Sequence, residues 1–179
     1  MKKLIKIGIP ISIIFLLTAC GNSENKKKEV PPENKTSVVI PKESIVKIND
    51  DILNAIYSHY VHLTAALAKD NVAEAKLAAN AIEAGALEIR SSSNLAADAA
   101  AIVSAPDIDK QRAAYSDLSN ELVSLLKKTG MADAELYVEY CPMAFGNKGA
   151  VWISSTKEVR NPYFGEKMLK CGEVKEIIK

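Results

Sequence analysis

Four sulfur-bearing residues near the C-terminus are the part of this sequence best suited to chemistry. They form two short pairs, Cys141 with Met143 and Met168 with Cys171. Two thiols and two thioethers make a soft-ligand set, and soft sulfur ligands select Cu(I) over metals that prefer oxygen. We therefore treat Cys141, Met143, Met168 and Cys171 as candidate metal ligands, with Cu(I) as the expected ion.

The spacing within each pair would place both of its sulfurs on one side of the local backbone. Residues two apart leave an extended segment on the same face, which would align Cys141 with Met143. Residues three apart are neighbours on a helical turn, which would align Met168 with Cys171. Gly172 would permit a close backbone approach beside Cys171. If the two segments meet, four sulfurs surround one point.

A disulfide between Cys141 and Cys171 is the alternative use of the same thiols. It would close a loop of about 30 residues and stabilise the fold by roughly 3–4 kcal/mol in the chain-entropy model. The methionines would then be ordinary packing residues. Zinc is a weaker alternative, because structural zinc sites use cysteine and histidine and neither pair has the CxxC spacing. Spacing alone leaves the metal site and the disulfide open.

The N-terminus has the organisation of a secretory signal that ends in a lipidation site. Three lysines precede a nearly unbroken apolar run over residues 7–17, which is too short to span a bilayer as a mature helix. The following Leu-Thr-Ala-Cys, residues 17–20, resembles the bacterial lipobox. There the signal peptidase cuts before the cysteine, which is acylated with chains such as palmitate. We expect a signal peptide over 1–19 and a lipid on Cys20. An ordinary secretory signal is the alternative.

Composition predicts a tether beyond the cleavage site and excludes one class of partner. Residues 20–44 are polar, charged and proline-containing, which predicts a flexible tether behind the lipid. The full chain has 23 basic and 22 acidic residues, and cleavage would remove three lysines and no acid, changing the net charge from +1 to −2. A chain with this balance lacks the excess of positive charge that binding to nucleic-acid phosphates requires. The glycine at position 21, where an aspartate would resemble the inner-membrane retention signal, favours the outer membrane.

Apolar periodicity predicts a helical bundle over residues 45–130. Ile52, Ile56, Tyr60, Leu63 and Leu67 recur at steps of three and four residues, as on one helix face. The second helix is alanine-rich, and Gly85 is suited to a close helix crossing. Its residues available for contact are Leu77, Ala81, Ile82, Ala84 and Ile89. The first expected helix begins at 44 or 48 and ends at 69. Three further helices are expected over 72–90, 95–103 and 107–128.

The apolar residues recur with a period of two after residue 131, which predicts a β-rich C-terminal subdomain over 131–179. Residues 136–140 and 150–154 alternate as strands would, and Asn147-Lys148-Gly149 between them is a turn signal, so we expect a hairpin. A turn at 161–165, a helical turn at 166–170 and a last short strand at 174–178 complete the subdomain. The expected fold is mainly α within the α+β class. It is an antiparallel helical bundle carrying a small C-terminal β-hairpin subdomain.

Other polar residues indicate no catalytic site, and we expect no enzyme. The chain has no HExxH, GxSxG or Walker-type glycine loop. His59 and His62 could share a metal at their spacing, but no acid-rich pattern supports this, and a polar edge of the first helix is the expected place for them. Arg112 and Asp117 are expected to form ion pairs at the surface or the edge of the bundle.

Four C-terminal stretches resemble a bacterial domain family of unknown function. They are YCPMA at 140–144, GAVWIS at 149–154, NPYFG at 161–165 and MLKCG at 168–172. The residues from Asp109 through Ser119 are similar to the "R…LS" helix of that family. The resemblance covers about residues 48–178. Members occur as stand-alone lipoproteins and as domains appended to the periplasmic adaptors of CusB-type copper/silver efflux pumps.

The resemblance implies copper handling outside the cytoplasm, with Cys141, Met143, Met168 and Cys171 at the matching positions. The chain lacks adaptor hairpin or barrel segments, so it would be a stand-alone module. We expect a protein of the bacterial cell envelope, held to the membrane by its N-terminal lipid and facing the periplasm. It would bind Cu(I) for handling or delivery, with copper efflux components as candidate partners. The alternative is a disulfide-stapled structural or protein-binding lipoprotein module without metal.

Overall fold

The structure is a computed structural model that describes residues 46–89 and 93–179. The chain divides into two units, Met1–Val39 and Ile40–Lys179, and all described residues belong to the second. The expected signal peptide, Cys20 and tether lie outside the described residues. No helix in the described ranges has both the length and the apolar character needed to cross a membrane.

Helix α1, Asp51–Ala68, begins later than the expected 44 or 48. The Asp50 carboxylate caps it by accepting a hydrogen bond from the Leu53 N–H at 2.8 Å. The preceding residues form strand β1, Lys47–Ile48, which pairs antiparallel with β2, Met131–Asp133. A local helical pattern cannot reveal pairing between segments so far apart in the chain, so both short strands were absent from the sequence prediction.

Helix α2, Val72–Ala86, packs closely against α1 through small residues. A methyl group on Gly85 would lie 2.9 Å from Ile56 Cγ1, so the predicted close crossing at this glycine is confirmed. Leu77 is 73% exposed, and its predicted role as a contact residue is wrong. Ile82, which was also predicted as a contact residue, is buried, and Ala75 and Ala79 complete the buried face because the helix lies close enough for methyl groups to fill the space.

Helices α3, Ser93–Ser104, and α4, Ile108–Thr129, complete the bundle. The Asp107 carboxylate accepts from the Lys110 N–H at 2.8 Å and caps α4 at its start. Gly130 ends it with a positive φ of 75° and donates its N–H to the Leu126 carbonyl. The predicted first and last turns of this helix are therefore confirmed within a residue.

A three-stranded antiparallel sheet comes after the bundle, in the order β4-β3-β5. The predicted hairpin is confirmed, with β3, Leu136–Cys141, paired to β4, Ala150–Ser154. Strand β5, Glu173–Ile178, adds to the other edge of β3. A short helix α5, Ala144–Asn147, lies between β3 and β4, and a 3-10 turn η1, Gly165–Lys167, precedes β5.

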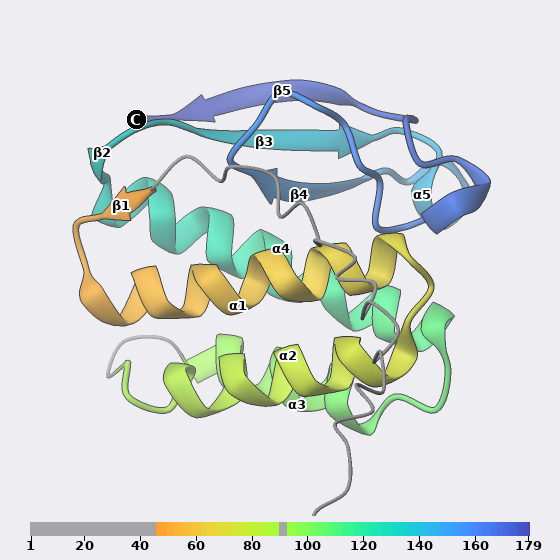
Figure 1. Ribbon diagram of the computed structural model, residues 1–179, viewed down its shortest axis with the longest axis horizontal. Coiled ribbons are helices and arrows are strands. Elements are labelled where there is room, and N and C mark those ends of the chain that lie inside the picture. The colour runs from red at the N-terminus through yellow and green to blue at the C-terminus, as the bar shows by residue number, and fades with distance from the viewer. Residues whose placement is uncertain (1–45, 90–92) are drawn as a thin grey trace, which may run out of the picture. The chain divides into compact units, whose positions relative to one another are not determined.

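The helices and the sheet stack in layers and share one core (Figure 1). The sheet covers α1 and α4, and α2 and α3 lie on the far side of these two helices. The observed α+β class, helices packed on one another with small antiparallel sheets, agrees with the expected fold class.

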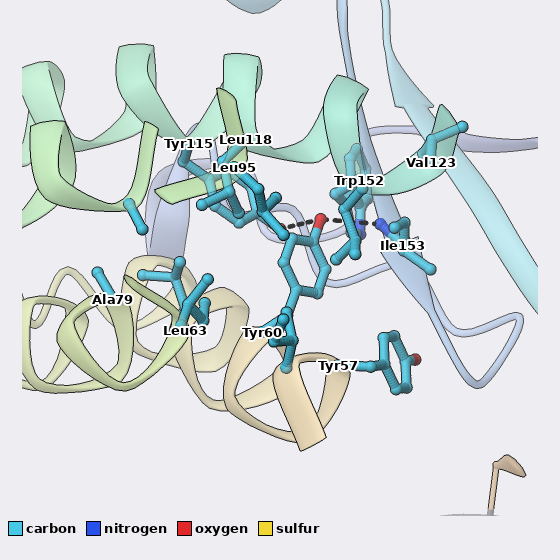
Figure 2. Close-up of a cluster of buried hydrophobic side chains, with 14 of the residues drawn as sticks. Tyr57, Tyr60, Leu63, Ala79, Leu95, Tyr115, Leu118, Val123, Trp152 and Ile153 are labelled. Atoms are coloured by element: carbon cyan, nitrogen blue, oxygen red, sulfur yellow. Dashed lines mark hydrogen bonds between the residues drawn. The ribbon is translucent and has the colours of Figure 1, made fainter. Parts of the chain in front are cut away.

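The Tyr60 hydroxyl joins the bundle to the sheet (Figure 2). It accepts a hydrogen bond from the Ile153 N–H of edge strand β4 at 3.1 Å. It also bonds with the Tyr115 hydroxyl and the Ser119 hydroxyl of α4, each at 2.8 Å. Burial raises the pKa of Tyr60 to about 12, so the group remains a neutral phenol in physiological conditions.

Candidate metal centre

The first sulfur pair lies where β3 ends and the chain turns into α5. Cys141 is the last residue of β3, is opposite Ala150 in the register and is fully buried. Met143 has helical angles, φ −87° and ψ −9°, and is 45% exposed. The expectation that both side chains leave one face of an extended segment is therefore wrong, because the strand stops at the cysteine.

The second sulfur pair lies in the turn between η1 and β5. The Cys171 N–H donates to the Met168 carbonyl at 3.0 Å, so a tight turn joins the two residues. Met168 has φ −147° and ψ 50°, so the helical turn that was expected to align the two side chains is not formed. Met168 and Cys171 are both half-buried.

Asn161 holds this turn in place, a role that the sequence did not reveal beyond a turn signal. Its side-chain amide donates to the Cys171 carbonyl at 2.6 Å, and its backbone N–H donates to the Leu169 carbonyl at 2.7 Å. Its side-chain oxygen accepts from the Tyr163 N–H at 2.8 Å. Asn161 is fully buried, and both the nitrogen and the oxygen of its side-chain amide make hydrogen bonds. Asn161 therefore positions the backbone that carries Cys171.

The structure brings three of the four predicted sulfurs together. Cys171 Sγ lies 4.0 Å from Met143 Sδ. The Cys141 thiol is also a close neighbour of Cys171, because it contributes to raising the pKa of the Cys171 thiol. Met168 is the exception, since no thiol hydrogen bond among the described residues reaches its sulfur.

The separation of the sulfurs suits a shared metal. Two ligands at about 2.3 Å from one metal, the usual zinc–thiolate distance, are about 4 Å apart at a trigonal angle. The Cys171–Met143 distance of 4.0 Å equals that separation. Desolvation and then the neighbouring Cys141 raise the pKa of the Cys171 thiol. Metal binding would therefore release protons from this pair. Both cysteines are free thiols in the structure.

Aromatic rings and one glycine enclose the buried side of the sulfur cluster. The Tyr163 ring packs against Trp152 and Phe145, with centroids 6.0 and 5.6 Å apart. A methyl group on Gly172 would lie 2.8 Å from the Trp152 ring, so the close approach predicted at this glycine is confirmed. Cys141 thus belongs to the same buried core as Trp152 and Tyr163, whereas Met143 is exposed to solvent.

Arg112 fixes the loop beneath the cluster to the helices. Its predicted ion pairing is confirmed by Asp70 and Asp109, but its own side chain is buried and not at the surface. Its guanidinium donates to the Pro162 carbonyl at 2.7 Å, the Leu67 carbonyl at 3.0 Å and the Asp70 carboxylate at 2.6 Å. The side chain is 8% exposed. Local sequence cannot show that the 161–165 turn returns to cover this position of α4.

The two histidines stay apart from the sulfurs as exposed residues of α1. Within the described ranges, no group of three or more histidine, cysteine or carboxylate residues could hold a metal ion. A metal held here would therefore need thioether ligands beside the thiols. The geometry defines a class of protein: a helical domain whose appended sheet presents a thiol–thioether cluster.

Comparison with known families gives a match over part of the helical bundle. Residues 56–134 match the model of a family described as a protein of unknown function, DUF3347. The match supports the resemblance to a domain family of unknown function, over less than half of the chain. It ends before Cys141 and says nothing of lipoproteins or efflux pumps. No curated protein matches the chain, and no solved structure matches it.

Proposed function

We propose that this chain is a lipid-anchored, periplasm-facing protein of the bacterial envelope that binds Cu(I). Cys141, Met143 and Cys171 would be ligands, and Met168 would complete the set. The observation that carries the proposal is the approach of Cys171 Sγ to Met143 Sδ at 4.0 Å, beside the Cys141 thiol. Two segments about 30 residues apart converge there, and no group of three or more histidine, cysteine or carboxylate residues in the described ranges could hold a metal without the methionines.

The chemistry of these donors favours Cu(I) over harder ions. Thioethers bind soft metals and contribute no charge, while thiolates supply most of the affinity. Zinc would be expected to recruit histidine or further cysteine. The exposed side at Met143 would allow the ion to enter and leave, which suits handling or delivery to copper efflux components. No catalytic role is part of the proposal.

A Cys141–Cys171 disulfide is the competing use of the same thiols, and their adjacency favours it equally. A disulfide cannot supply thiolates, so the protein would bind Cu(I) only when reduced. With the disulfide closed, the protein would be a stapled structural or protein-binding module. The mass of the isolated protein distinguishes the two, since the disulfide form lacks two hydrogens and would resist mild reductant.

Competition between the reduced full chain and a Cu(I) chelator tests the proposal. Cys171→Ser and Cys141→Ala should each weaken Cu(I) binding at least about a hundredfold, because each removes a thiolate ligand. Alanine is used at position 141 because a hydroxyl buried there would lack a partner. Unchanged competition in both variants would sink the proposal.

Methionine substitutions separate ligands from packing residues. Met143→Leu should weaken binding about tenfold, or about 1.4 kcal/mol, with the fold intact. Met131→Leu makes the same chemical change in β2 and should leave binding unchanged. A loss at Met168→Leu similar to that at Met143→Leu would confirm four sulfur ligands, whereas no change would reduce the set to three.

A further inference from the structure

An open pocket of about 310 Å³ lies between the first turns of α4, helix α5 and the 161–165 turn. The charged residues of its lining, all from α4, are Asp109, Lys110 and Arg112. The wall that faces them includes Phe145, Tyr163 and Phe164. The four candidate sulfurs are not part of the lining. The volume is at the lower end of the range of ligand pockets, about 300–1,000 Å³. The pocket therefore combines charge with aromatic surface, apart from the proposed metal centre.

One guanidinium nitrogen of Arg112 remains available to a ligand. Its Nε and Nη2 make the hydrogen bonds to Pro162, Leu67 and Asp70. Nη1 makes no hydrogen bond in the described ranges, and it keeps accessible surface. The Asp109 carboxylate lies 3.9 Å from Nη1, which is too long for a hydrogen bond. Because three hydrogen bonds fix a side chain that is nine-tenths buried, Nη1 is a donor already in place before a ligand arrives.

The other charges around this nitrogen leave room for an anion. Lys110 is exposed, and no ion pair of the described residues includes it. Asp70 is bound to the Nη2 side of the guanidinium. Asp109 is the acid of the lining, and its side chain is 91% exposed, so water screens its charge and the carboxylate is free to turn away. An anionic ligand would thus meet two cationic donors and one screened acid.

Phe145 is held in the facing wall by a strained backbone. Its φ of 51° and ψ of 47° lie in the left-handed region, which costs a residue other than glycine about 1–2 kcal/mol. Gly146 and Asn147 continue with φ of 67° and 68°. The Phe145 ring meets the Tyr163 ring edge-on, at 5.6 Å between centroids, and the residue remains 41% exposed. The turn therefore presents an aromatic side chain at the pocket instead of burying it.

Size and lining select the class of ligand. At the roughly 30 Å³ per molecule of liquid water, about 310 Å³ holds about ten non-hydrogen atoms. The cationic donors exclude a metal ion, and an inorganic oxyanion would leave the aromatic wall uncovered. We propose that this pocket binds a small organic carboxylate. Its oxygens accept from Arg112 Nη1 and from Lys110, as arginine pairs with carboxylates elsewhere, and its apolar body lies against Phe145 and Phe164.

Benzoate tests the proposal on the full chain, beside acetate, which lacks the ring, and benzyl alcohol, which lacks the charge. The Arg112 Nε–H donates to the Pro162 carbonyl at 2.7 Å, so its nuclear magnetic resonance signal should be protected from exchange and report on the guanidinium. Millimolar benzoate should shift this signal saturably, and acetate and benzyl alcohol should each bind at least about tenfold more weakly. Equal binding of benzoate and either control, or no saturable shift, would overturn the proposal.

Charge variants at the pocket should change the affinity in opposite directions. Asp109→Asn removes the acid beside Nη1 and should tighten benzoate binding about threefold, whereas Lys110→Gln should weaken it about threefold. Asp117→Asn and Lys128→Gln make the same changes at exposed positions further along α4 and should leave the affinity unchanged. If neither pocket variant differs from its control, the carboxylate does not bind beside Arg112.

Wall variants test the apolar half of the pocket without touching Arg112. Phe145→Gly removes the ring at a backbone conformation that glycine adopts readily, and it should weaken benzoate binding at least about fivefold. Ala113→Leu adds bulk to the lining at an exposed helix position that suits leucine, so it should block binding with the fold intact. Wild-type affinity for benzoate in both variants would contradict the proposal.

Discussion

At the scale of single residues, Glu139 makes stability depend on pH. In the unfolded chain its carboxyl loses its proton near the ordinary pKa of 4.5, while in the fold burial holds the pKa at about 8. Between these values the folded state binds one more proton than the unfolded state. Raising the pH through this window therefore favours unfolding.

Glu139→Gln should remove this dependence. The free energy of unfolding of the wild type should fall, relative to that of the variant, by up to about 1.4 kcal/mol per pH unit between about pH 5 and 8. Urea unfolding at several pH values measures both slopes, and Glu88→Gln, at an exposed position that does not contribute to the pKa of Glu139, is the control. Parallel curves for wild type and Glu139→Gln would show that the buried acid titrates normally.

At the scale of elements, the Tyr60 hydroxyl explains how edge strand β4 is held against α1. An edge strand leaves backbone N–H groups unpaired, and here one of them, from Ile153, bonds to a side chain of the helix below. The same hydroxyl contacts Tyr115 and Ser119, so α1, α4 and β4 meet at one oxygen (Figure 2).

Tyr60→Phe should therefore destabilise the fold by about 1–3 kcal/mol, because the Ile153 N–H would stay buried without its acceptor. Tyr137→Phe is the matched control, since its hydroxyl makes a long 3.4 Å bond to the nearby Glu135. Urea unfolding measures both variants. Equal stabilities of the two would mean that the Tyr60 hydroxyl does not join the layers.

At the scale of the whole molecule, the proposed role depends on where the chain is held. A lipid on Cys20 would place the folded unit near the membrane, and more than one acyl chain is needed for stable anchoring. This residue lies outside the described ranges, so the expectation depends on the sequence alone.

Cys20→Ala should release the protein from the membrane fraction, because the residue that accepts the lipid is gone. Cell fractionation followed by intact-mass measurement checks this, with the wild type expected to begin at residue 20 and to carry acyl mass. Cys171→Ser is the control, since it removes a thiol and leaves the lipobox unchanged. Membrane retention of the Cys20→Ala protein would contradict lipid anchoring.

The sequence by itself determined the local structure. The stripe through Ile56, Tyr60 and Leu63 predicted the buried face of α1, although Ile52 at its start is 39% exposed. The capping residues around α4 predicted its ends within a residue. Alternation and a turn signal were enough to predict the hairpin. These features depend on neighbours a few positions away, which is the range over which periodicity and capping act.

Only the tertiary structure decided the features that join distant segments. It buried Arg112 beneath the 161–165 turn, paired β1 with β2 and buried Glu139 in the middle of β3. It also brought three of the four candidate sulfurs together and left Met168 aside, because β3 stops at Cys141 and Asn161 fixes the turn before β5. The sulfur types were readable in the sequence, but their meeting required the return of a segment about 30 positions away.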